Sequence, residues 1–255
     1  MFITYYKMYN LSVGCLFKNE SHCMKEWIEH YLHHGVDHFY MINDNSNDDF
    51  MPILNPYINN NIVTLFNDNK SYYTGRQRDM YNTFILPKIK ETKWLLMIDM
   101  DEFVWSPTNI NLNDILNTCN HIGQIQIYDV LYGSNGFIEQ PSLLVNSFTM
   151  RQKEPRRHLK YFVNTNYEFS SLNVHHATFV NKHDEIHHFK ILDHHIFILN
   201  HYNCQSLTFW NDVKCTRGDS DNYLVRTPED FIKLDCNEIE DLRLKEQNKN
   251  IIYKY

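Results

Sequence analysis

One short segment constrains the fold of this chain more than any other. It is the apolar run from Trp94 to Ile98, which ends in the acids Asp99, Asp101 and Glu102. An unbroken apolar run of this length is typical of a strand buried on both faces, in the middle of a parallel sheet. Ligands of open α/β sheets bind beyond the carboxyl ends of the strands. Because the acids follow the run directly, we expect them at such a binding edge.

The same acids predict a metal site. The spacing of Asp99 and Asp101 suits a hard divalent cation, which takes carboxylate oxygens and shares itself with substrate phosphates. The competing interpretation is a solvated loop or a helix N-terminus, where acids are also frequent. A short motif does not decide between the two, so the rest of the chain is needed.

Composition excludes several other classes of protein. The chain has 255 residues, of which 43% are hydrophobic, and this is enough for one large domain. A net charge of −7 argues against a broad nucleic-acid-binding surface. The six cysteines contain no CxxC pair, so a zinc or disulfide framework is not expected. We find no apolar segment of membrane-spanning length and no signal peptide, and therefore expect a cytoplasmic protein without nucleic-acid partners.

The first hundred residues alternate between strand and helix patterns. Residues 11–17 read as a strand, and residues 22–34 as a helix with Ser21 as its N-cap and Gly35 closing it. Further strands are predicted at 36–42, 62–66 and 94–98, with a helix at 77–86 that Pro87 disturbs. This order predicts an α/β fold with a parallel sheet.

The later half of the chain is less regular. Strands are predicted at 123–130 and 143–150, and the charged segment 231–255 is expected to contain a C-terminal helix. Residues 151–200 mix basic, aromatic and histidine residues with short strands. This half offers no internal repeat and no low-complexity linker that would divide it from the first.

Several short motifs follow one another in a familiar order. They are Lys18-Asn19-Glu20, Glu26-Trp27-Ile28, the loop 43–48, Gln77 with Asn82, the segment 94–103, the turn 133–136, the segment 199–202, and Lys214 with Arg217-Gly218. Over roughly residues 11–220, this order resembles glycosyltransferases of family 2 and the related family 92. Each motif is weak alone, but their common order is specific.

The resemblance implies a fold, a donor and a cofactor. The fold is the GT-A type of α/β, a mostly parallel central sheet with flanking helices and a less regular C-terminal acceptor-side region. The whole chain, 1–255, is then one domain, with a nucleotide-binding half at 1–105 and an acceptor-side half at 106–255. The implied donor is a nucleotide-diphosphate sugar, with UDP preferred. The implied cofactor is Mn²⁺ or Mg²⁺, and the acceptor is a glycan or a protein-linked glycan.

The resemblance also assigns the metal ligands. Asp99 and Asp101 match the acidic motif that binds metal and ribose-phosphate. Asp101 is the expected direct metal ligand and, in that role, a catalytic residue. Asp99 is then expected on ribose hydroxyls or on a metal-bound water. His201 matches a position that closes over the metal and the diphosphate. Neutral imidazole suits Mn²⁺, although a buried core histidine is the competing interpretation.

Other residues are expected to bind the nucleotide. The nucleotide turn of the wider fold often begins with two acids, whereas this chain has Asn43 and Asp44. Either side chain is a candidate for the hydrogen bond from uracil N3. The remaining candidates are Lys18, Arg76 and Gln77 for the nucleotide, and Lys214 and Arg217 for the diphosphate. Solvated surface charge is the alternative for each of these cations.

No sequence feature selects a catalytic base. An inverting transferase needs a base to deprotonate the acceptor, usually a carboxylate. The candidates are Asp129, Glu139, Glu154 and Asp193. The histidines between 175 and 195 lack a metal-site pattern and are read as surface or core residues, with His175 or His176 as possible lining of the acceptor cleft.

Two rival functions stay open at this point. A nucleotidyltransferase also uses paired acids beside a phosphate, but it normally has a glycine-rich loop near its first strand, where this chain has only Gly14. A non-catalytic sugar-nucleotide or glycan-binding module has no need of acids that hold a metal on a leaving group.

Overall fold

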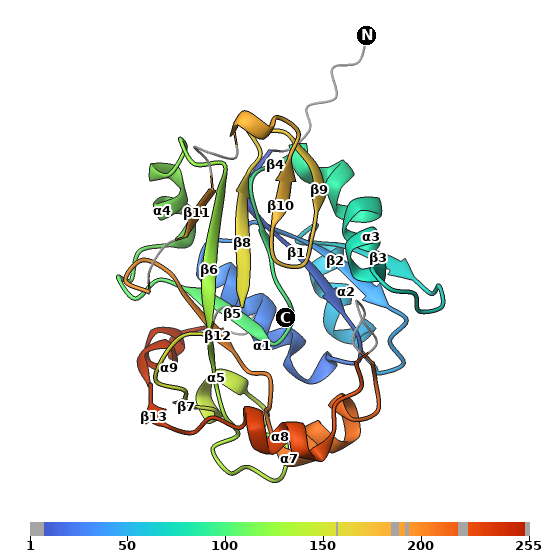
Figure 1. The fold of residues 1–255 in the computed structure, drawn as a ribbon, viewed down its shortest axis with the longest axis vertical. Coiled ribbons are helices and arrows are strands. Elements are labelled where there is room, and N and C mark those ends of the chain that lie inside the picture. Colours follow the sequence, from blue (N-terminus) through green and yellow to red (C-terminus); the bar gives the residue numbers. More distant parts are fainter. Residues whose placement is uncertain (1–7, 157, 185–188, 192–193, 219–223, 253–255) are drawn as a thin grey trace.

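A nine-stranded sheet forms the centre of the protein (Figure 1). The computed structural model describes residues 8–156, 158–184, 189–191, 194–218 and 224–252. The sheet has the order β3-β2-β1-β4-β8-β6-β12-β5, and β11 pairs with β6. Its strands are β1 (Tyr9–Phe17), β2 (His38–Asp44), β3 (Val63–Asp68), β4 (Thr92–Met97), β5 (Glu102–Trp105), β6 (Gln124–Leu131), β8 (Leu159–Asn164), β11 (Phe189–Ile191) and β12 (Ile198–His201).

The first four strands are parallel to one another, as predicted. β4, the apolar run, lies beside β1, and Val13 of β1 faces Leu96 in the pairing. Gly14 permits a close approach here, because a Cβ at this position would lie 2.5 Å from Met97 Sδ. The isolated glycine near the first strand thus has a packing role in the sheet.

The later strands add an antiparallel element that the sequence did not predict. β8 is antiparallel to both β4 and β6, between which it lies. β12 is parallel to β6 and antiparallel to β5, and its register places His201 opposite Glu102. The prediction of an α/β fold with a mostly parallel sheet is confirmed, and this pairing brings His201 to the edge where the acids lie.

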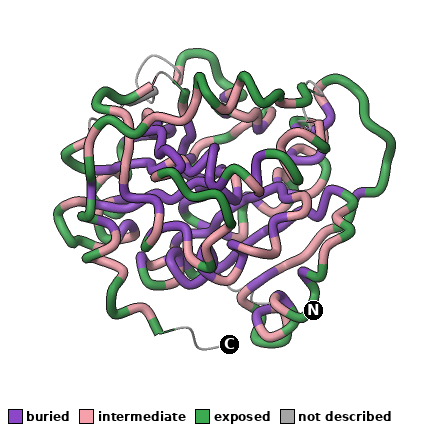
Figure 2. Tube along the Cα trace, turned by 90° about the horizontal axis from the view of Figure 1, so that it is seen from below, coloured by how far each residue is buried: buried purple, intermediate pink, exposed green. Residues whose placement is uncertain are grey.

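Helices and small hairpins cover the sheet, and buried residues gather in its middle (Figure 2). The helices are α1 (Ser21–His33), α2 (Met51–Asn59), α3 (Arg76–Met80), α4 (Leu112–Thr118), α5 (Leu144–Ser147), α7 (Leu207–Phe209), α8 (Pro228–Leu234) and α9 (Arg243–Asn248). α3 continues as a π turn and a 3-10 turn to Glu91, and α7 as a π turn to Lys214. One hairpin pairs β9 (Phe169–Leu172) with β10 (Ala177–Phe179), and a second two-stranded sheet pairs β7 (Met150–Arg151) with the distant β13 (Ile239–Glu240).

The polar loop after β2 is anchored to the turn after β1. The predicted N-cap Ser21 is instead the first residue of α1, and its backbone N–H donates to the Asp48 carboxylate at 2.8 Å. Ser46 Oγ accepts from the backbone N–H of Asn19, and Asn19 Oδ1 accepts from that of Asn47. This loop therefore closes the start of α1. The other end of α1 is as predicted, since Gly35 follows it with a φ of +92°.

One prediction about local structure was wrong, and one helix was not predicted. Residues 143–150 form α5 followed by β7 instead of one strand, because the buried Glu26 carboxylate accepts the backbone N–H groups of Leu144 and Val145 at 2.5 and 3.0 Å. α2 was not predicted, and its start carries a proline, which suits a first helical turn. The helix expected within segment 231–255 is confirmed as α9, and α8 begins just before that segment. Among the described residues, no helix combines the length and apolar character that crossing a membrane requires.

Two buried histidines attach the C-terminal helix to α1. Asn248, at the end of α9, accepts a hydrogen bond from His34 Nε2 at 3.0 Å and donates one to His30 Nδ1 at 3.0 Å. His30 Nε2 donates to the carbonyl of Val104 at 2.9 Å. The bond that Asn248 donates to Nδ1 requires a neutral His30 ring, and burial lowers the pKa of His30 well below its usual range and that of His34 to about 4.

This arrangement predicts acid-sensitive stability. A histidine whose pKa is lowered by folding stabilises the protein fully above its unfolded pKa of about 6.5, and the stability is lost as pH falls toward the folded value. For His34 alone the loss between pH 6.5 and 4 is about 3 kcal/mol. Urea denaturation across this range should show a shallower fall in unfolding free energy for His34→Gln than for the unsubstituted protein. The exposed His121, which has no part in these contacts, supplies the control, since His121→Gln should leave the slope unchanged; equal slopes for all three proteins would contradict the assignment.

Candidate active site

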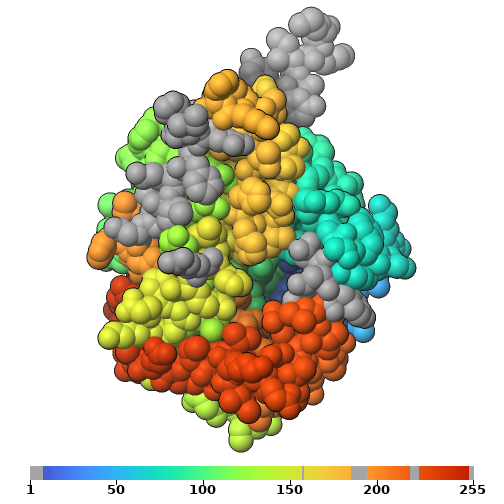
Figure 3. All heavy atoms as spheres, viewed as in Figure 1, coloured from blue at the N-terminus to red at the C-terminus, as the bar shows by residue number. Residues whose placement is uncertain are grey.

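A cleft of about 310 Å³ opens at the carboxyl ends of β1 and β4. Figure 3 shows it as a hollow between the β9–β10 hairpin, in gold, and the α7–α8 region, in orange, with blue and green atoms at its floor. Its charged and polar lining consists of Lys18, Glu20, Gln77, Asp99, Asp101, Glu102, His158, Lys160, His175, His201, Asn203, Lys214, Arg217 and Arg226. Residues from the two ends of the chain therefore share one cavity.

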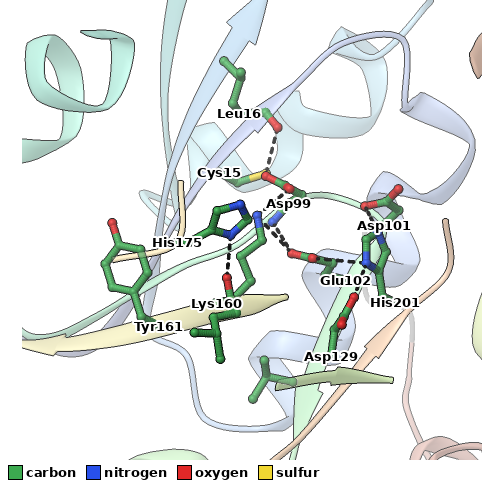
Figure 4. Close-up of polar contacts among 12 residues, drawn as sticks. Cys15, Leu16, Asp99, Asp101, Glu102, Asp129, Lys160, Tyr161, His175 and His201 are labelled. Atoms are coloured by element: carbon green, nitrogen blue, oxygen red, sulfur yellow. Dashed lines mark hydrogen bonds and ion pairs between the residues drawn. The ribbon is translucent and has the colours of Figure 1, made fainter. Parts of the chain in front are cut away.

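The first acid of the motif is held by a buried lysine. Lys160 Nζ, from the start of β8, lies 2.5 Å from Asp99 Oδ2 and 3.5 Å from Glu102 Oε2 (Figure 4). The side chain of Lys160 is 4% exposed, whereas that of Asp99 is 34% exposed. The lysine therefore pairs with Asp99 from the buried side and leaves the carboxylate open to the cleft. Burial disfavours the charge on Lys160, but Asp99 and Glu102 outweigh this and raise its pKa. Burial also raises the pKa of Glu102 to about 7, despite the opposing effect of Lys160.

The second acid meets cations from the C-terminal region. Lys214 Nζ lies 2.8 Å from Asp101 Oδ2, and His201 Nε2 lies 3.6 Å from Asp101 Oδ1. Burial alone would raise the pKa of Asp101, but Lys214 and His201 hold it well below its usual range. For His201, burial opposes the charged form, and Asp101 and Glu102 outweigh it and raise the pKa to about 9. In the ligand-free protein at neutral pH, Asp101 is thus ionised between two cations.

A second contact of His201 lies on the side away from the cleft. Its Nδ1 is 2.8 Å from Asp129 Oδ2, and Asp101 and Asp129 lie on opposite sides of the ring (Figure 4). Arg156 binds Asp129 through both carboxylate oxygens. Burial tends to raise the pKa of Asp129, but His201 and Arg156 lower it to about 2. Asp129 itself is fully buried.

The segment after the π turn that ends at Lys214 is tied to the turn that follows β1. Arg217 donates to the backbone carbonyl of Lys18 and lies 2.9 Å from the Glu20 carboxylate. Burial raises the pKa of Glu20, and the effect of Arg217 opposes this. The wall that carries Lys214 and Arg217 is therefore fixed to the N-terminal half by charge pairs.

The structure does not bring all the predicted nucleotide residues into the cleft. Lys18, Gln77, Lys214 and Arg217 line it, as the metal-site candidates do, whereas Asn43, Asp44 and Arg76 are not among its lining. Asn43 Oδ1 accepts the backbone N–H of Ser46, and Asp44 is paired with the buried Arg76. These three side chains support the polar loop and its neighbouring strand, so uracil recognition by Asn43 or Asp44 stays a prediction that requires them to change partners.

None of the candidate bases that the structure describes lines the cleft, whereas the candidate metal ligands do. Glu139 and Glu154 are exposed and do not line the cleft, and Asp193 lies outside the described residues. Asp129 is close to the cleft but separated from it by His201. The imidazoles of His158 and His175 do line the cleft, and burial lowers the pKa of both.

Several site residues escaped the sequence analysis. Lys160 and Arg156 lie in a basic segment that predicts neither its strand nor its charge partners. Glu20 and Glu102 were seen only as parts of motifs. Local sequence patterns do not reveal the role of these two acids, because the cation that pairs with each of them lies more than fifty residues away in the sequence.

The family model for glycosyltransferase family 92 matches residues 7–244. The chain belongs to glycosyltransferase family 92. Its own mostly parallel central sheet with flanking helices is the α/β arrangement that was predicted for the GT-A type. The resemblance drawn from the motif order is likewise confirmed.

Curated relatives come from plants. A family 92 protein of Ricinus communis is 25% identical over 214 residues, which is 78% of this chain and 36% of the relative. One from Oryza sativa subsp. japonica is 24% identical over 164 residues, 60% of this chain and 26% of the relative. The chain thus spans about a third of the length of these relatives.

Among solved structures, residues 1–349 of TarS from S. aureus in complex with UDP-GlcNAc align with a TM-score of 0.48 at 14% identity, covering 88% of this chain and 64% of that chain. The mannosyltransferase PcManGT from Pyrobaculum calidifontis, in complex with GDP-Man and Mn²⁺, aligns with a TM-score of 0.37 at 10% identity, covering 63% and 45%.

The buried lysine offers a direct test of this site's electrostatics. Lys160→Met leaves two neighbouring acids, Asp99 and Glu102, without their cation, and breaking a buried pair in this way costs about 3–5 kcal/mol. Unpaired carboxylates have raised folded pKa values, so the loss relative to the unsubstituted protein should be larger at pH 8 than at pH 5. Denaturation at both pH values measures it, with Lys233→Met, at a 72% exposed lysine, as the control. A pH-independent difference would show that Lys160 contributes only packing.

Proposed function

We propose that this domain is a metal-dependent glycosyltransferase that moves a sugar from a nucleotide-diphosphate sugar to a glycan or protein-linked acceptor. The observation that carries the proposal is the meeting of Asp99, Asp101 and His201 in one cleft with the cations Lys214 and Arg217. A diphosphate leaving group needs both kinds of residue, since acids hold a metal ion and cations neutralise phosphate oxygens. Membership of glycosyltransferase family 92 supports the same reaction class.

The donor atoms at the cleft fit Mn²⁺ or Mg²⁺. Among the described residues, no three acid, histidine or cysteine side chains already converge as a metal cage. Asp101 Oδ1 and His201 Nε2 nevertheless face each other at 3.6 Å, and an oxygen–nitrogen pair suits Mn²⁺ when substrate phosphates complete the ligand set. When bound there, the ion supplies charge stabilisation to the departing diphosphate.

The chain's own side chains then divide the remaining tasks. Lys214 and Arg217 lie beside the acids and are suited to bind the diphosphate oxygens. Asp99, kept in place by Lys160 and 3.4 Å from Gln77 Nε2, presents an open carboxylate suited to ribose hydroxyls. Lys18, at the end of β1, lies where the nucleotide half 1–105 meets the cleft. Within residues 106–255, His201, Lys214 and Arg217 are assigned to the donor side of the cleft, and we assign the lining around His158 and His175 to the acceptor.

UDP is the proposed nucleotide, and its binding should depend on the metal. Calorimetry with UDP in Mn²⁺ and again in EDTA should show an affinity loss of roughly tenfold or more, which is about 1.4 kcal/mol for each tenfold. Asp101→Asn should bind UDP with the EDTA affinity under both conditions, because it lacks the main ligand. Release of UDP from UDP-sugars in Mn²⁺ tests catalysis in the same samples. Equal affinities in Mn²⁺ and EDTA would remove the metal from the proposal, and binding without release would favour a non-catalytic module.

Lys214 should affect the two ligands in opposite directions. In the ligand-free protein its ammonium occupies Asp101, where the metal is proposed to bind. Lys214→Met should therefore raise the Mn²⁺ affinity measured without nucleotide by roughly fivefold, the equivalent of about 1 kcal/mol. The same variant should weaken UDP binding in saturating Mn²⁺, because a phosphate partner is lost. Lys249→Met, at a 63% exposed lysine, is the control; a change of the same sign for both ligands would contradict the dual role.

A further inference from the structure

The position of Asp129 is unusual for an acid beside an active site. It lies on β6, next to the parallel strand β12 that carries His201, and the register pairs it with Leu199. Leu199 and His201 are two positions apart on β12, so their side chains point to the same face of the sheet. Asp129, which is paired with Leu199, points to that face as well. Asp129 is fully buried there and contributes nothing to the lining of the cleft.

Three groups surround Nδ1 of His201, and the Glu102 carboxylate is the farthest of them at 3.5 Å. The Asp129 carboxylate lies 2.8 Å from this atom, and Arg156 Nη2 lies 3.0 Å from it. Nδ1 can donate a proton to the acid or accept one from the arginine, but not both. Arg156 already donates to both oxygens of Asp129, and the bond from Nδ1–H to a carboxylate is charge-assisted. The proton therefore stands on Nδ1 and points to Asp129.

We propose that Asp129 is a positioning residue, whose carboxylate fixes the His201 ring so that Nε2 faces Asp101 and the cleft. This inference rests on the proposed metal-dependent function. Histidines that bind metals commonly donate their other ring N–H to a carboxylate, which sets the tautomer, holds the ring and makes the ligating nitrogen more basic. Here the carboxylate, ring and Asp101 stand in that order, from the buried side of the sheet to the cleft (Figure 4).

The same geometry excludes Asp129 from the role of catalytic base. A base must reach the acceptor hydroxyl directly or through one water, and it works best with a pKa near the operating pH. Asp129 is fully buried, does not line the cleft and is covered by His201, so it has no direct path to an acceptor hydroxyl. Arg156 donates to both oxygens of Asp129, so the carboxylate keeps a cationic partner besides His201.

The first test asks which ring nitrogen binds a metal. Protein labelled with ¹⁵N-histidine is loaded with ¹¹³Cd²⁺, a diamagnetic probe, in the presence of UDP. Coupling between ¹¹³Cd and ¹⁵N should appear on Nε2 of His201, identified by its loss in His201→Ala, while Nδ1 keeps its proton. Coupling to Nδ1 would overturn the inference, because that atom must then have left Asp129.

The second test compares two buried acids. Asp129→Asn keeps the shape but removes the charge, and we expect its Mn²⁺ affinity to fall about tenfold to a hundredfold, as for other supporting carboxylates. Asp241→Asn is the matched control, since Asp241 is also buried, is also paired with arginines and also has a pKa lowered to about 2, but lies outside the cleft lining. The control should lose stability and keep its Mn²⁺ affinity.

The outcomes separate this inference from the proposed function. Unchanged Mn²⁺ affinity in Asp129→Asn would overturn the positioning role and leave the metal-dependent transferase intact. A wild-type protein that binds neither Mn²⁺ nor Cd²⁺, with or without UDP, would overturn both. If Asp129→Asn does not fold, the coupling measurement on wild-type protein decides alone.

Discussion

The pairing of acids with cations from distant parts of the chain is the interaction on which this structure depends. The carboxyl edge of the parallel sheet gathers Glu20, Asp99 and Asp101, and like charges so close together, with little water, are costly. Each acid meets a partner supplied by the later half of the chain: Arg217, Lys160 and Lys214 respectively. These acids of the first half of the chain therefore depend on cations from the second half to compensate their charge.

This dependence links stability to the proposed chemistry. A cation that neutralises an acid in the ligand-free protein is already within reach of any phosphate that binds beside that acid. Lys214 and Arg217 need only exchange carboxylate oxygens for phosphate oxygens, which are chemically similar acceptors. Lys160 is different, because its side chain is almost completely buried and contacts Asp99 from the side away from the cleft. The more exposed cations suit exchange with ligand, and the buried one suits support of the site.

The sequence predicted the parts of this fold in which local pattern and tertiary structure agree. The apolar run 94–98 and the strand–helix alternation before it needed no long-range information, and the motif order identified the family. The strand predicted at 143–150 was wrong because a single buried carboxylate, Glu26, stabilises a helical turn there. The bounds of β8 were not predicted for a related reason. Its apolar and polar residues do not alternate regularly, and its place between β4 and β6 is set by pairing with those strands.

The site shows the same division between residue type and position. The acids were expected from their type and spacing and His201 from the family resemblance, and they share one cleft. Asn43, Asp44 and Asp129 have equally suitable side chains, but hydrogen bonds and ion pairs within the fold occupy them. Whether a polar side chain can bind a ligand depends on its remaining unpaired atoms, and a sequence does not contain that count. Asp129 illustrates the consequence, since a carboxylate at the right strand end acquires a role by orienting its neighbour and has no direct access to the substrate.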